Sequence, residues 1–225
     1  MKELSIRLKT IASLVPNDTR VCDIGTDHGY LPIYLRLNNL AKSVIAADLN
    51  PKPLITAQKN IEKLNANGIE LRLCDGLSGI NRQEVDTIII AGMGGNVISG
   101  IIDRCDFAKD KDLTFILQPT TSGEILREFL CENGFEIMSE TVVFENQKLY
   151  SVMVVKFSNH ENTYPYGFYY IGNIKPDNEN SLNYIKKQQK RLLSETKALE
   201  NIAERKPEFL KLSSACDYIA KTLTE

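Results

Sequence analysis

The sequence predicts an α/β domain followed by a small helical domain, and three observations lead to this expectation. Five short apolar runs recur between residues 20 and 118. Amphipathic segments with helical periodicity separate these runs. After Gly134 the alternation stops, and two strand-like runs follow one another with no helix between them. We therefore expect a doubly wound, mostly parallel sheet that an antiparallel C-terminal hairpin closes on one side.

The expected strands are rich in β-branched and aliphatic residues and show little polar alternation, which is typical of strands buried on both faces. They are residues 20–24, 43–49, 69–74, 85–91 and 113–118. The expected helices are residues 31–40, 53–68, 95–105 and 122–134. Gly68 and Gly134 stand where helices commonly end. The hairpin is expected from residues 135–145 and 148–158.

A polar segment, residues 158–167, is expected to link two domains, which we place at 1–158 and 159–225. In the second domain, apolar residues recur with three- and four-residue spacing, which predicts a short helical hairpin of coiled-coil type. These residues are Leu182, Ile185, Leu192, Leu199 and Ala203. Pro207 suits the first turn of the second helix.

Composition places the chain among ordinary globular proteins, with 43% apolar and 25% charged residues. The net charge of -2 neither indicates nor excludes a nucleic-acid partner. No apolar run approaches the ~20 residues that cross a membrane, and the first residues lack a signal-peptide core. The five cysteines form no CxxC pair and the two histidines have no ligand-spaced partners. We therefore expect reduced thiols, a cytoplasmic protein and no metal.

The segment DIGTDHGYLP, residues 23–32, joins the first strand to a helix that is expected to start near Leu31. Gly25 and Gly29 form a turn where a ligand can approach the backbone beside the start of the helix. The D-x-G-x-x-x-G spacing differs from G-x-G-x-x-G, which argues against a dinucleotide loop and against a Walker-type phosphate loop. A turn without a ligand is the alternative.

Acidic or glycine-rich turns follow the next three strands as well. Asp48 ends the second strand, where a carboxylate accepts hydrogen bonds from a ribose diol. Asp75 follows the third strand and suits an adenine amino group, and the run AGMGG (91–95) exposes backbone after the fourth. Each acid alone is more often a helix cap or a solvated turn. Together, with no phosphate-binding lysine, they predict a nucleoside cofactor without a polyphosphate, for which S-adenosylmethionine is the natural candidate.

Four motifs in this order give the chain a specific resemblance: DIGTDHGYLP, AADLNPKPLITAQKN, LRLCDGL and IIIAGMGGNVI. It resembles the TrmK family of bacterial tRNA (adenine-N1)-methyltransferases, which modify adenine 22 of tRNA. The likeness covers nearly the whole chain, and its first and fourth motifs are the specific ones. It implies a Rossmann-like class I methyltransferase domain, a small coiled-coil C-terminal domain, S-adenosylmethionine as cofactor and tRNA as partner. The C-terminal region matches weakly, so the resemblance assigns no RNA contacts there.

The resemblance places the loop around Asp23 at the methionine end of the cofactor, Asp48 at the ribose, and Asp75 with Gly76 at the adenine. Gly92, Met93 and Gly94 would form the wall beside the transferable methyl group. Gly29 stands where many relatives have Ala. The cofactor-binding candidates are Asp23, Gly25, Thr26, Asp27, His28, Gly29, Asp48, Leu49, Asp75, Gly76, Gly92, Met93 and Gly94.

Asp27 and His28 are the catalytic candidates. The fourth strand lacks the [D/N]-P-P-[Y/F] motif of enzymes that methylate exocyclic amines, and no cysteine follows it closely. The N1 lone pair of adenine attacks the methyl group directly, so catalysis is mostly positioning. A carboxylate, for which we nominate Asp27, would stabilise the positive charge that develops on the ring. His28 either holds the cofactor or transfers a proton.

The substrate-binding candidates serve a flipped adenine and the RNA backbone. Apolar and aromatic side chains receive a flipped base, and basic side chains contact phosphates. The candidates are Arg7, Tyr30, Met93, Gln118, Pro119, Lys187, Lys190 and Arg191. Core packing of Tyr30 and Met93, and a solvated coiled-coil face for the lysines, are the alternatives. We expect a monomer or weak dimer. A methyltransferase for another RNA, a protein or a small molecule, or a non-catalytic binding protein, is the alternative function.

Overall fold

The computed structural model describes residues 4–160 and 163–224, and in this part of the chain seven strands form one sheet in the order β3-β2-β1-β4-β5-β7-β6. The first five strands are parallel, and β7 runs antiparallel to both β5 and β6. The sheet topology that the sequence predicts is therefore confirmed. The strands are β1 (Arg20–Ile24), β2 (Ser43–Asp48), β3 (Ile69–Leu73), β4 (Thr87–Gly94), β5 (Thr114–Thr121), β6 (Phe135–Glu145) and β7 (Lys148–Phe157).

Helices cover both faces of the sheet, and two of them, α1 and α6, have no counterpart among the sequence predictions. The α-helices are α1 (Ile6–Ser13), α2 (Tyr30–Leu37), α3 (Pro51–Leu64), α4 (Gly95–Asp103), α5 (Gly123–Glu132), α6 (Phe168–Ile171), α7 (Glu179–Leu199) and α8 (Lys206–Thr222). Short 3-10 turns occupy residues 82–84 and 203–205. The Ser5 side chain caps α1 by accepting the N–H of Leu8 at 3.3 Å.

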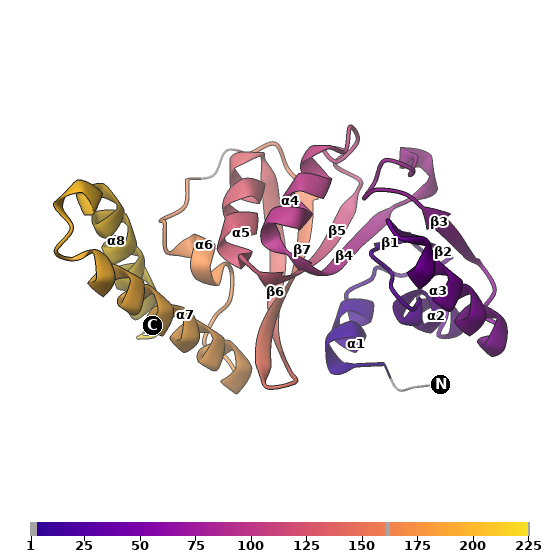
Figure 1. The fold of residues 1–225 in the computed structure, drawn as a ribbon, viewed down its shortest axis with the longest axis horizontal. Coiled ribbons are helices and arrows are strands. Elements are labelled where there is room, and N and C mark those ends of the chain that lie inside the picture. Colours follow the sequence, from indigo (N-terminus) through magenta and orange to yellow (C-terminus); the bar gives the residue numbers. More distant parts are fainter. Residues whose placement is uncertain (1–3, 161–162, 225) are drawn as a thin grey trace.

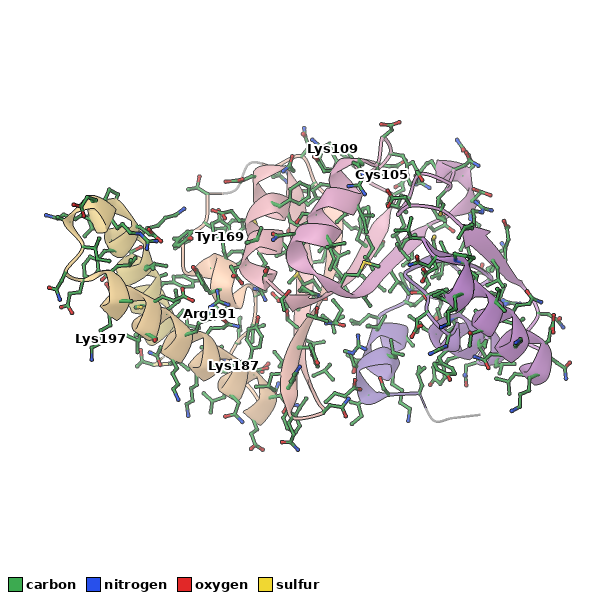
Figure 2. The ribbon with its side chains drawn as sticks, in the orientation of Figure 1. Cys105, Lys109, Tyr169, Lys187, Arg191 and Lys197 are labelled. Carbon is green, nitrogen blue, oxygen red and sulfur yellow. The ribbon has the colours of Figure 1, made fainter. Side chains whose placement is uncertain are left out.

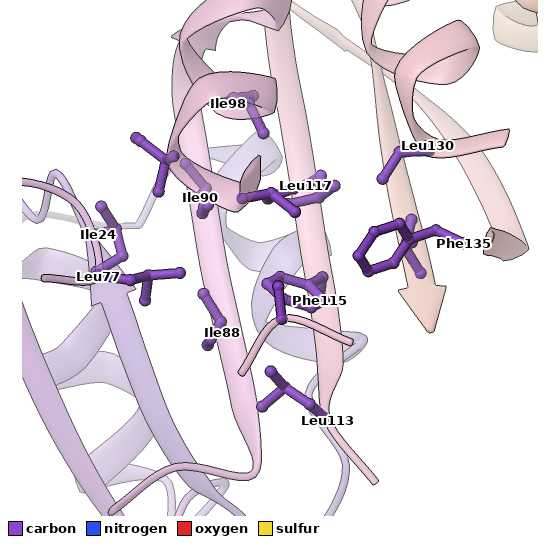
Figure 3. Packing of buried hydrophobic residues seen from close by; sticks show 14 of the residues in the cluster. Ile24, Leu77, Ile88, Ile90, Ile98, Leu113, Phe115, Leu117, Leu130 and Phe135 are labelled. Carbon is purple, nitrogen blue, oxygen red and sulfur yellow. The ribbon is translucent and has the colours of Figure 1, made fainter. Parts of the chain in front are cut away.

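The core lies in two layers on either side of the central strands. Ile88 and Ile90 of β4 face α4 and α5, where they pack with Ile98, and Figure 3 shows this layer. The residue between them, Ile89, faces α1 and α2 and packs with Ile11. Because side chains of a strand alternate between the two faces, a continuous apolar run serves both layers. The sheet is buried on both faces at β4, as the sequence predicts.

The C-terminal helices α7 and α8 lie side by side at the β6 end of the sheet, away from β3 (Figure 1). Ile185, Leu192 and Leu199 of α7 pack in one cluster with residues of α8. The prediction for Ala203 is wrong, because α7 ends at Leu199 and Ala203 is exposed in a 3-10 turn. Tyr184, which the predicted pattern does not include, is buried.

The segment around the proposed domain boundary contains little regular structure. β7 ends at Phe157, and residues 158–160 and 163–165 form no helix or strand, while residues 161–162 of the predicted linker lie outside the described residues. We keep residue 158 as the proposed boundary. The two parts share core packing, since Phe168 of α6 packs with the sheet's cluster.

Left-handed residues set two of the element ends that differ from the sequence predictions. α2 begins at Tyr30, with Gly29 as its N-cap at φ 70°, so His28 lies in the loop before the helix. α3 ends at Leu64 because Asn65 takes the left-handed C-cap, and Gly68 leads into β3. β4 continues to Gly94, pairing with β5 through two bulges.

A buried ion pair joins the sheet to the C-terminal helices. Arg127 of α5 and Glu140 of β6 both have fully buried side chains, and Arg127 Nε donates to Glu140 Oε1 at 3.1 Å. The same guanidinium donates to the Tyr169 carbonyl (2.9 Å), the Ser151 hydroxyl (3.2 Å) and the Tyr184 hydroxyl (3.1 Å). One side chain thus connects α5, β6 and β7 with α6 and α7.

The described residues include no helix with both the length and the apolar character that a membrane span requires. Within the same residues, no three His, Cys, Asp or Glu side chains gather in a way that could hold a metal ion. The five cysteines are all free thiols.

Candidate active site

A cavity of about 260 Å³ opens where β1 and β4 end and α1 and α2 begin. Parallel strands bring their carboxyl ends to the same edge of the sheet, which is where ligands bind in open α/β folds. The lining residues are Arg7, Leu8, Asp23, Gly25, Thr26, Asp27, His28, Tyr30, Leu31, Ala91 and Gly92. The cavity therefore gathers the β1–α2 loop, the end of β4 and the N-terminal helix.

The β1–α2 loop is fixed by backbone hydrogen bonds to β2. The N–H groups of Gly25 and Thr26 both donate to the Ala47 carbonyl, at 2.9 and 3.0 Å. Gly25 has φ 75°, and a Cβ there would lie 2.3 Å from Met93 Cε. Gly25 thus permits both the sharp turn and the close approach of Met93.

Asp23 is a buried carboxyl group at the end of β1, with 5% of its surface exposed. Burial, together with the nearby Asp48 carboxylate, raises its pKa from 3.8 to about 6. Among the described residues no cation pairs with it. A cationic ligand group in the cavity would stabilise its charged form. His28 also lines the cavity, and its Nδ1 atom is buried and has no hydrogen-bond partner in the described part of the chain. These features suit a ligand that carries an amino group and polar atoms.

Asp23 makes the free energy of unfolding fall as the pH rises. Its carboxyl titrates near 3.8 in the unfolded chain and at about 6 in the folded chain. Between these values the folded state binds more protons, so stability is lost with rising pH, by about 3 kcal/mol once the pH exceeds 6. We expect Asp23→Asn to be more stable than the wild type near neutral pH. The measurement is urea unfolding of both proteins across this pH range, where a pH-independent difference between them would contradict the assignment.

The ends of β2 and β3 lie next to the loop, outside the lining of the cavity. Asp48 accepts the N–H of Asn50 at 2.9 Å and that of Asp27 at 3.4 Å. Because a carboxylate offers about four acceptor positions, Asp48 retains capacity for a diol. Leu49, just after it, is 62% exposed, and its side chain is available to pack against a base.

The Cys74 N–H donates to the Asp48 carbonyl at 3.0 Å, which aligns the end of β3 with that of β2. Asp75 has a 62% exposed side chain, with its Oδ1 3.6 Å from Arg104 Nη2. Gly76 follows with φ 54°, and a Cβ there would lie 3.0 Å from the Ile101 side chain. The residues predicted to bind the ribose and the adenine thus lie at one edge of the sheet beside the cavity, with Asp75 exposed and Gly76 buried.

The end of β4 is held by a buried glutamine. The Gly92 N–H donates to Gln118 Oε1 at 3.2 Å, and Gln118 is fully buried. At Gly94 a Cβ would lie 3.2 Å from Thr121 Oγ1, so this strand end lies tightly against β5. Met93 packs its terminal methyl over Gly25.

The catalytic candidates lie together at the mouth of the cavity. The Asp27 carboxylate is 70% exposed, and its Oδ2 lies 3.5 Å from His28 Nε2. The His28 ring centroid is 5.5 Å from that of Tyr30, and Asn60 Nδ2 donates to the His28 carbonyl at 2.9 Å. The arrangement offers an exposed carboxylate and two rings to a planar substrate.

Arg7 joins the cavity to residues far along the chain. Its Nη1 donates to Gln118 Oε1, its backbone N–H to Glu145 Oε1 at 3.0 Å and its Nε to Glu145 Oε2 at 3.4 Å. Its guanidinium carbon lies 5.6 Å from the centroid of the Tyr150 ring. Glu145 and Tyr150 were not predicted as site residues, because they stand in a hairpin without a motif.

The three basic residues of α7 that are substrate-binding candidates differ in whether they line a groove. Lys187 and Arg191 line a groove of about 290 Å³ that Pro119 also lines, while Lys190 is exposed outside that lining. Figure 2 shows Lys187 and Arg191 on α7, the former nearer the β6–β7 hairpin. Arg191 forms ion pairs with Glu124 (2.7 Å) and Glu195 (3.2 Å), which neutralise much of its charge.

Comparison with known proteins bears directly on this site. Residues 4–153 match the family model described as a methyltransferase domain. The tRNA (adenine(22)-N(1))-methyltransferase of Bacillus subtilis is 38% identical over 167 residues, which are 72% of this chain and 68% of that protein.

Solved structures extend the likeness over the full length. The crystal structure of the B. subtilis m1A22 tRNA methyltransferase TrmK superposes with a TM-score of 0.87 at 28% identity, covering 99% of this chain and all of that one. Mycoplasma capricolum TrmK in complex with S-adenosyl-homocysteine gives 0.79 at 28% identity and 98% coverage of both chains. The chain belongs to the TrmK family of tRNA (adenine(22)-N(1))-methyltransferases.

Proposed function

We propose that the protein transfers the methyl group of S-adenosylmethionine to N1 of adenine 22 in tRNA. The activity named for its relatives supports the proposal, and so does the cavity. The single observation that carries it is the convergence of the β1–α2 loop, Gly92 and Arg7 on one cavity beside Asp48. Such an arrangement suits a nucleoside cofactor on one side and a base on the other.

S-adenosylmethionine, when bound, supplies an electrophilic methyl group. In the proposed arrangement Asp48 accepts the ribose hydroxyls, and the buried carboxylate of Asp23 favours the cationic amino end. Tyr30, which lines the cavity, receives the unstacked base, and Met93, which lies outside that lining with its terminal methyl near Gly25, packs beside it. Asp27, exposed at the mouth, faces the ring as it becomes positively charged.

The decisive experiment incubates the protein with S-adenosylmethionine that carries a tritiated methyl group and with unmodified tRNA. We expect label in tRNA, and mass mapping should place it at N1 of adenine 22. A tRNA in which that adenine is replaced by guanine is the control. Label in a protein or metabolite fraction alone would overturn the substrate, and binding without any transfer would indicate a non-catalytic protein.

Gly25→Ala should weaken cofactor binding by about tenfold or more. The left-handed φ of 75° strains any side chain, at about 1–2 kcal/mol, and the new Cβ displaces Met93 across the floor of the site. Calorimetric titration with S-adenosylmethionine measures the change. Gly100→Ala, the same substitution inside α4, is the matched control and should leave the affinity unchanged. Equal affinities of the two variants would contradict the placement of the methionine end at this loop.

A tRNA-modifying role fits the predicted cytoplasmic location and the predicted monomer or weak dimer. Gel filtration with light scattering across a dilution series measures the oligomeric state.

A further inference from the structure

The groove beside α7 lies immediately next to the cavity. Three segments line it: the end of β5 with the start of α5, the start of β7, and α7 between Tyr184 and Arg191. Its lining residues are Pro119, Thr120, Thr121, Ser122, Gly123, Glu124, Leu149, Tyr150, Ser151, Tyr184, Lys187, Gln188 and Arg191. At about 290 Å³ it is near the lower end of the range for small-molecule sites, about 300 Å³, and suits one nucleotide.

Tyr150 is a contact between the groove and the cavity. Tyr150 is one of the residues that line the groove, and its ring lies 5.6 Å from the guanidinium carbon of Arg7, which lines the cavity. Gln118, which accepts from Arg7, donates through Nε2 to the carbonyl of Pro119 at 2.8 Å. The contacts among Arg7, Gln118 and Tyr150 therefore link the lining of the cavity to the lining of the groove.

The chemistry of the groove matches a single-stranded nucleotide. An aromatic ring offers a stacking surface for any base, and such stacking dominates recognition of unpaired RNA. Lys187 is exposed at the groove and supplies a cation for phosphate, whereas Arg191 is already paired with Glu124. Thr121 and Ser122, which carry hydroxyl groups, also line the groove and suit a ribose.

We propose that this groove is a second nucleotide site, which holds a nucleotide flanking the target adenosine with its base on Tyr150 and its phosphate at Lys187. The proposal rests on the proposed function, because it assumes that the cavity takes the target base. It makes Tyr150 a positioning residue: the ring holds the neighbouring nucleotide and thereby delivers the target to the cavity.

Two variants of Tyr150 test the stacking. Tyr150→Ala should raise the KM for tRNA roughly tenfold, as loss of one stacked base predicts, with kcat and the affinity for S-adenosylmethionine within about threefold of wild type. Tyr150→Phe keeps the ring and should restore the wild-type KM. A merely structural role would instead lower cofactor affinity and thermal stability, which are measured in parallel.

Fluorescence quenching of a base analogue measures the same stacking contact without requiring methyl transfer. 2-Aminopurine, placed in tRNA on either side of the target adenine, should be quenched at one of the two positions by the wild type and by Tyr150→Phe, and at neither by Tyr150→Ala. Quenching unaltered by Tyr150→Ala, with an unaltered KM, would overturn the groove as a nucleotide site. Failure of the wild type to methylate tRNA would overturn the proposed function instead, so the two failures are distinguishable.

Lys187→Gln keeps the proposal testable if Tyr150→Ala does not fold, because Lys187 is exposed. We expect a higher KM for tRNA and a log–log salt slope of binding that falls by about 0.7, as for one lost phosphate contact on a single strand. The matched control is Lys197→Gln, on the same helix but farther from the groove (Figure 2). Equal salt slopes for both variants would contradict phosphate binding at Lys187.

Discussion

Arg127→Met lowers the free energy of unfolding by about 3–5 kcal/mol, because it leaves the fully buried carboxylate of Glu140 without its cation. The carbonyl of Tyr169 and the hydroxyl of Tyr184 lose a donor as well. For a chain of this length the change corresponds to a fall in melting temperature of roughly 6–20 °C. Thermal and urea unfolding measure it.

Two further variants separate the buried pair from an ordinary ion pair. Arg205→Ala removes an exposed partner of Glu208 and should change stability by less than about 1 kcal/mol. Replacing Arg127 and Glu140 together with Met should recover part of the loss, because no uncompensated charge remains. A single Arg127→Met variant as stable as Arg205→Ala would show that water or a rearranged side chain compensates Glu140.

Asp27→Asn lowers the rate of methyl transfer by about 10²-fold while S-adenosylmethionine binds within about threefold of wild type. The substitution keeps the shape of the side chain and the backbone N–H that Asp48 accepts, and it removes only the charge that faces the developing cation. Single-turnover rates at saturating cofactor and tRNA, together with calorimetric affinities, measure the two effects.

Asp18→Asn is the matched control for this variant. Asp18 is exposed and has φ 55°, nearly the value of 52° at Asp27, so both substitutions meet the same left-handed backbone. Asn tolerates that conformation well. A rate for Asp27→Asn near that of Asp18→Asn removes the carboxylate from the chemistry and leaves Asp27 as a loop residue.

The central strands could be predicted because burial on both faces leaves a local signature, whereas the edge strand β3, also expected to be buried, has no fully buried residue. Apolar runs such as residues 87–90 carry this signature in their own composition, and Gly25 and Gly29 mark the turn that follows β1. The end of α3 could not be predicted, because Asn65 and Gly68 are both able to adopt the left-handed conformation that ends a helix.

The residues that could not be predicted from the sequence are those whose partners lie far away in the chain. Glu145 and Arg7 are 138 positions apart in the sequence, and no motif near either residue indicates that they pair. Arg127 stands in an amphipathic helix where a basic residue usually faces solvent, and only the approach of β6 and the C-terminal helices buries it. The C-terminal heptad pattern failed at Ala203 for a related reason, since the helix had already ended.

The buried pair has an evolutionary consequence. Replacing Arg127 alone leaves the buried Glu140 carboxylate and other buried acceptors without a donor, and replacing Glu140 alone leaves the buried guanidinium charge without its partner. The two positions should therefore covary among relatives, with the guanidinium and the carboxylate kept or replaced together. Tyr184 should follow them, because its hydroxyl accepts from the same guanidinium. The contacts that attach the C-terminal helices to the sheet would then be detectable as covariation among three positions in the family's sequences.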